Sequence, residues 1–61
     1  MGKHTVPVGD KYYEVLVIQH SKTVWRATGE FYGKPIEVKG GSAAQALEYW
    51  RSAAAAAYDR Q

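Results

Sequence analysis

Hydrophobic and polar side chains alternate along two stretches of the chain, and a third stretch is rich in aromatic and β-branched residues; both patterns are typical of β-strands. The alternation is cleanest in Val24 to Tyr32 (VWRATGEFY). Tyr12 to His20 (YYEVLVIQH) is dense in aromatic and β-branched residues, and Ile36 to Lys39 (IEVK) alternates again. We therefore predict three strands over these stretches.

The apolar spacing changes to three and four residues after the third stretch, which indicates an amphipathic helix. Ser42 is a suitable N-cap, because its hydroxyl can accept a hydrogen bond from a free backbone N–H of the first turn. Alanine is the strongest helix former, so the Ala-rich segment from Ala43 to about Tyr58 is predicted to be helical. The apolar stripe expected to face the sheet consists of Ala43, Leu47, Trp50, Ala54 and Ala57.

Two residues refine how these elements pack. Pro35 has no N–H to donate to a β-ladder, so the third strand is expected at a sheet edge, with Val24–Tyr32 in the centre. Gly29 interrupts the central strand, and a glycine there suits a close neighbour that needs the space. We expect the side chain of Trp50 to fill that space.

Together these elements predict an α+β fold in which a three-stranded antiparallel β-meander packs on one C-terminal α-helix (β-β-β-α). Residues 1–10 are expected to form a flexible N-terminal tail, because they are polar, contain Pro7 and show no clear period. Residues 11–61 are then a single domain. The chain of 61 residues has no cysteine, so its packing must come from large side chains such as Trp and Tyr.

No residues with catalytic or metal-ligating spacing are visible. His4 and His20 stand outside any recognisable motif, and the acidic residues are scattered over the predicted tail, strands and helix. A nucleophile needs a base beside it, and that base needs an orienting partner. We therefore expect a protein that is not an enzyme and that uses no metal or cofactor.

The chain has no long apolar run and no apolar segment near its N-terminus, so we expect no membrane span, no signal peptide and a cytoplasmic protein. Its formal net charge of +2 and pI of about 9.0 permit nucleic-acid binding without requiring it.

The face of the sheet that the helix leaves open carries the candidate binding residues. A β-sheet or ribbon can enter the major groove of DNA and read base edges with polar and basic side chains. Glu30 and Glu37 share the predicted face, so an ordinary solvated face with cross-strand ion pairs is the other interpretation. The candidates are Arg26, Thr28 and Lys39 on the strands, with Lys22 and Lys34 at the turns.

The segment from Lys22 to Trp50 combines a strand, a Gly-Lys turn, another strand and a Ser-capped helix. Its motifs are Trp25-Arg26, Gly33-Lys34, Ser42, Ala46 and Glu48-Tyr49-Trp50. This arrangement resembles the arm-type DNA-binding domains at the N-terminus of phage and transposon integrases. In that family the open face of the sheet lies in the DNA major groove. The resemblance implies a small bacterial or phage-type DNA-binding protein with contacts from Arg26, Thr28, Lys34 and Lys39.

Protein–protein association is the alternative. In a three-stranded meander Tyr12–His20 is an edge strand, and an unpaired apolar edge can pair with a second copy to form a homodimer. The Ala-rich helix offers another surface, because residues such as Ala44 and Tyr49 flank its apolar stripe. The sequence leaves both alternatives open.

Overall fold

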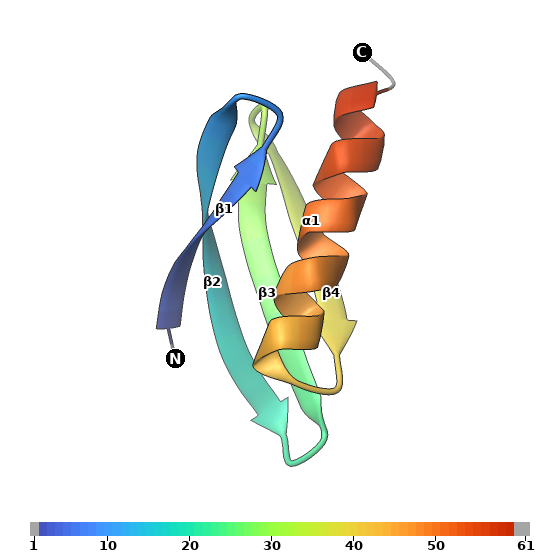
Figure 1. Cartoon of the computed structure of the whole chain (residues 1–61). Coiled ribbons are helices and arrows are strands. Elements are labelled where there is room, and N and C mark those ends of the chain that lie inside the picture. The colour runs from blue at the N-terminus through green and yellow to red at the C-terminus, as the bar shows by residue number, and fades with distance from the viewer. Residues whose placement is uncertain (1, 60–61) are drawn as a thin grey trace.

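The sheet has four antiparallel strands in the order β1-β2-β3-β4, and a C-terminal helix, α1, crosses one of its faces (Figure 1). This computed structural model describes residues 2–59. The predicted α+β class, with an antiparallel sheet and one C-terminal helix, is confirmed, but the prediction of three strands is wrong. The elements are β1 (Gly2–Val8), β2 (Lys11–Ser21), β3 (Val24–Phe31), β4 (Lys34–Gly40) and α1 (Ala43–Asp59).

The fourth strand, β1, comes from the segment predicted to be a loose tail. It pairs with β2 from Gly2↔Val17 to Val8↔Lys11. Val6 and Val8 are only 6% and 4% exposed, so β1 contributes to the core. Pro7 is tolerated because β1 is an edge strand, and one side of its backbone needs no strand partner.

The presence of β1 makes β2 an interior strand. Val15 of β2 pairs with His4 on one side and with Gly29 on the other. The prediction that Tyr12–His20 is an edge strand is therefore wrong, because β1 pairs with β2 as far as Val17. The outer strands are β1 and β4, which confirms that Pro35 lies in an edge strand.

Trp50 is the residue that seats α1 on the sheet. Its side chain is fully buried, and its Nε1–H donates a 3.0 Å hydrogen bond to the carbonyl oxygen of Ile36 in β4. A methyl group at Gly29 would stand 2.9 Å from Cζ2 of Trp50 and 2.9 Å from the carbonyl oxygen of Glu14. The predicted packing of Trp50 over Gly29 is confirmed, and the glycine is needed for this close approach.

The start of α1 follows the prediction as well. The backbone N–H of Gln45 donates to Oγ of Ser42 at 3.1 Å, and the Gln45 side chain accepts a 2.6 Å hydrogen bond from the N–H of Gly41. These paired bonds satisfy donors that the first turn leaves free. They fix the point at which the chain leaves β4, so that Ala46 and Ala54 join Trp50 in the core.

The β3–β4 turn lies one residue earlier than the sequence suggested. Tyr32 and Gly33 form a two-residue turn, with φ angles of 54° and 78°. Positive φ at both positions defines the type I′ turn, which matches the twist of paired strands. Tyr32 is thus a turn residue and not the end of the strand, while Lys34 begins β4.

The first prediction concerns the space over Gly29. Gly29→Ala should lower the free energy of unfolding by about 1–3 kcal/mol, because the added methyl group collides with Trp50 and with the backbone of β2. Urea unfolding followed by fluorescence measures this change. The same substitution made on a Trp50→Phe background should cost less, because the smaller ring lacks the atom that the methyl group meets. An equal cost in both backgrounds would contradict the role given to Trp50.

The second prediction tests β1. Val6→Ala should cost roughly 1–3 kcal/mol of unfolding free energy, because the deleted methyl groups leave a buried site. The neighbouring exposed Thr5 is the control, and Thr5→Ala should stay within about 0.5 kcal/mol. If the two variants have the same stability in urea, these residues do not form a core strand.

Candidate nucleic-acid interface

The strand register places the candidate residues of the open face in rows. In one row Ile18 of β2, Arg26 of β3 and Lys39 of β4 lie side by side. In the next row Thr28 of β3 pairs with Glu37 of β4. Residues directly opposite one another share a face, so Arg26, Thr28 and Lys39 lie together as predicted.

Lys22 and Lys34 lie at opposite ends of β3. Lys22 is exposed in the β2–β3 turn, at the end of the sheet nearest Arg26 and Lys39. Lys34 pairs with Phe31, which belongs to the core. Lys34 therefore lies on the α1 side at the far end, and its prediction as part of the open-face group is wrong.

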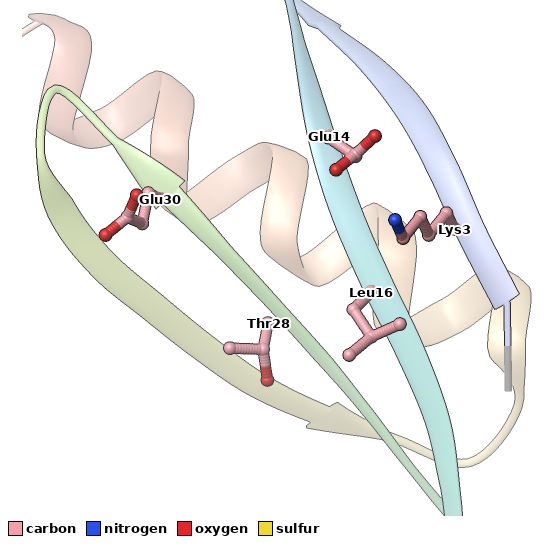
Figure 2. Close-up of a pocket in the computed structure, with 5 residues that line it drawn as sticks. All are labelled: Lys3, Glu14, Leu16, Thr28 and Glu30. Carbon is pink, nitrogen blue, oxygen red and sulfur yellow. The ribbon is translucent and has the colours of Figure 1, made fainter.

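Acidic side chains gather toward that far end of the open face. Glu14 and Glu30 flank the paired residues Val15 and Gly29, and Glu30 is four residues, or about 13 Å, along β3 from Arg26. A shallow hollow of about 440 Å³ lies on the open face beside Glu14 and Glu30 (Figure 2). It is lined by Lys3, Glu14, Leu16, Thr28 and Glu30. The row with Arg26 and Lys39 is thus basic and the row with Glu14 and Glu30 is acidic, while the row between them carries Lys3 and Glu37. The alternation pattern alone could not reveal this distribution.

Glu37 is the acidic residue that lies among the basic side chains. Its Oε2 is 3.0 Å from Nε of Arg26, although the N–H is not directed at the oxygen, so the contact is an ion pair and not a hydrogen bond. Both side chains are partly exposed, at 35% and 51%. The pair holds the guanidinium group against the sheet and leaves its other N–H groups available, since arginine has five donors.

The β2–β3 hairpin extends beyond its neighbours. The last β1 residue paired with β2 is Gly2, opposite Val17, and the last β4 residue paired with β3 is Gly40, opposite Trp25. Past Gly2, β2 continues beside β3 and β4, and only the Ser21↔Val24 pair and the turn that contains Lys22 extend beyond β4, at the lower end of the molecule in Figure 1. The β2–β3 hairpin has a register shift between Gln19 and Ser21.

The described part of the chain gives no sign of a metal centre or a membrane span. Among residues 2–59, no three His, Asp or Glu side chains come together as metal ligands. The helix present in that range, α1, falls short of the length and hydrophobicity that crossing a bilayer requires.

Comparisons with models of protein families, with curated proteins and with solved structures give no match. The resemblance to arm-type integrase domains therefore stays a prediction that rests on the residues quoted for it. What the protein binds must be inferred from the chemistry of its own surface.

Proposed function

We propose that this protein is a small non-enzymatic module that binds duplex DNA through its basic end, which we define as Lys22, Arg26 and Lys39. The observation that carries the proposal is the segregation of charge along the open face. Because Glu14 and Glu30 lie toward the opposite end, they do not directly oppose phosphates approaching the basic end. The resulting positive field would attract the DNA backbone.

The shape of this end suits a groove. The β2–β3 turn and the open face of the sheet behind it project toward this end, and a β-sheet or ribbon can enter the major groove of B-DNA, which is about 12 Å wide. In this arrangement Lys22 and Lys39 would contact phosphates, and Arg26 would present its free N–H groups to base edges. Thr28 lies one row deeper on the same strand and can offer both a hydroxyl and a methyl group.

The resemblance to arm-type domains adds support, because those domains also use the open face of a sheet. The resemblance implies contacts from Arg26, Thr28 and Lys39, and these three residues share the open face. Lys34 departs from it, since it lies on the α1 side of the sheet. We therefore leave Lys34 out of the proposed DNA contacts and retain Lys22.

The test is a titration of the 15N-labelled protein with a mixed-sequence DNA duplex at low salt, followed by amide NMR. Amides of residues 20–28 and 37–40 should shift, and those around Glu14 and Glu30 should shift least. Lys22→Gln and Lys39→Gln should each weaken binding several-fold and reduce the slope of log K against log salt by about 1. Glu37→Gln should strengthen binding, because it removes the negative charge beside Arg26.

Arg51→Gln is the matched control for this titration. It removes one positive charge from an exposed residue of α1 that pairs with Glu48, away from the open face. Its affinity for the duplex should stay close to that of the unchanged protein. If the duplex moves no amide signals at low salt, or if Arg51→Gln weakens binding as much as Lys39→Gln, the proposal fails.

Association through α1 is a second candidate, favoured by side chains exposed on the helix. Tyr49 is 46% exposed, and Ala56 is exposed two turns further along the same side of the helix. Sedimentation velocity over a wide range of concentrations tests for a dimer formed by this surface. A dimer that dissociates in Tyr49→Lys would support it, and a monomer at every concentration would exclude self-association.

A further inference from the structure

Like charges stand next to one another in two rows of the open face. Arg26 pairs directly with Lys39 across β3 and β4, and we call these two residues the basic row. Glu14 and Glu30 stand opposite each other on β2 and β3, one position beyond the last backbone pair of these strands, and we call them the acidic row. Like charges directly opposite one another destabilise a sheet, so neither row stabilises the single chain by its own pairing.

The chain itself neutralises little of this charge. Arg26 has Glu37 beside it, at 3.0 Å. Among residues 2–59, no ion pair within 4.0 Å engages Lys39, Glu14 or Glu30. All three side chains are exposed, so each is open to a charge supplied from outside the chain.

The open face also has an apolar centre. Leu16 pairs with Thr28 in the row between the two charged rows, which we call the middle row (Figure 2). Ile18 lies one row away, beside Arg26. Leu16 and Ile18 are only partly buried, on the side of the sheet away from α1. An apolar centre within a polar and charged surround is the usual anatomy of a protein interface.

The order of the rows makes this face complementary to itself. Thr28 of the middle row is two residues, or about 7 Å, from Arg26 on one side and from Glu30 on the other. A two-fold axis along the middle row would therefore bring the basic row of one copy over the acidic row of a second copy, and the reverse. Most homodimers have such an axis, and both copies then contribute the same patch.

The hollow on the open face lies where the opposing charge would arrive. It is lined by both glutamates of the acidic row, by Leu16 and Thr28 of the middle row and by Lys3. The two-fold axis places this hollow under Arg26 of the second copy. Carboxylates accept the forked N–H groups of a guanidinium group, and an aliphatic side chain such as Leu16 can lie against the arginine stem.

The rest of the face permits a weak interface. Lys3 and Glu37 lie at the two ends of the middle row, so the axis sets each opposite its own counterpart at the rim, where water and salt screen the repulsion. A standard interface covers about 800 Å² of each partner, or about a fifth of the 4282 Å² surface of this chain. The open face is one broad side of a molecule of 36 × 18 × 17 Å, so such an interface would use most of it.

We infer that the open face pairs with a second copy of this chain in a two-fold dimer, with the basic row of each copy against the acidic row of the other. The inference concerns the chain alone and does not rest on duplex binding. It adds a competition, because the dimer covers Arg26 and Lys39, so that the dimer must separate before DNA can bind. The duplex titration therefore reports the monomer only at protein concentrations below the dissociation constant of the dimer.

The test is sedimentation velocity without nucleic acid, over a wide range of protein concentrations. The unchanged chain should dimerise at low salt, and added salt should separate the dimer, because its contacts join exposed charges. Glu14→Lys with Glu30→Lys, and separately Arg26→Glu with Lys39→Glu, should each raise the dissociation constant about tenfold or more, since like charges then face each other. A one-to-one mixture of these two double variants should recover the dimer, because each supplies the row that the other lacks.

Two single substitutions are the controls. Lys3→Gln removes a positive charge from the same face but from the middle row, so the dimer should be at least as tight as before. Tyr49→Lys changes an exposed residue of α1 and should leave the dimer intact. These controls and the salt dependence decide the question even where a double variant does not fold.

Four results would overturn the inference. These are a monomer at every concentration, a dimer that salt does not affect, a mixture of folded double variants that stays monomeric, and a dimer that Tyr49→Lys separates. A monomeric chain would leave duplex binding untouched. A duplex that moves no amide signals would likewise leave the dimer untouched, so the two proposals fail separately.

Discussion

The contact between Trp50 and Gly29 fixes the position of the helix on the sheet, and the rest of the structure depends on it. The indole ring can approach β3 this closely only because no side chain projects from Gly29. Its N–H also bonds to β4, so one residue joins α1 to two strands. A small domain without disulfides needs such packing, because it buries a modest fraction of its surface and has little stability to spare.

Seating α1 in this way divides the molecule into surfaces with different chemistry. The helix covers one face of the sheet and leaves the other to solvent. Since the strands form a meander, the β2–β3 turn lies at one end, and the other two hairpin turns lie at the opposite end with the last turn of α1. The basic end is therefore far from those two turns in an elongated molecule, with extents of 36 × 18 × 17 Å.

Much of this architecture could be predicted from the sequence, because the strongest local signals agree with the final packing. The alternation of Val24–Tyr32 predicts strand β3, and the hydroxyl of Ser42 predicts where α1 begins. The missing side chain of Gly29 predicts where Trp50 packs. Strand β1 was missed because its apolar signal is only Val6-Pro7-Val8, and proline normally argues against a strand. Its burial depends on pairing with β2, which is a tertiary effect.

The candidate site was predictable only in part, for a similar reason. Face alternation correctly placed Arg26, Thr28 and Lys39 together. It could not show that Glu14 and Glu30 lie at the other end, because that depends on the register between strands. The β3–β4 turn begins one residue earlier than the sequence suggested, and Lys34 therefore lies on the α1 side of the sheet and not on the open face. The contact between Tyr32 and Tyr58 had no sequence signal, since these residues are 26 positions apart and meet only in the folded chain.

The two outer strands share a property that bears on how the protein behaves at high concentration. Each contains a proline, Pro7 in β1 and Pro35 in β4, and proline cannot donate a backbone hydrogen bond to an added strand. Any chain that docked along either edge would meet an interrupted ladder of donors. Such interruptions are a known protection against edge-to-edge aggregation and amyloid growth. The proline that obscured β1 in the sequence thus helps to keep the folded sheet from extending into fibrils.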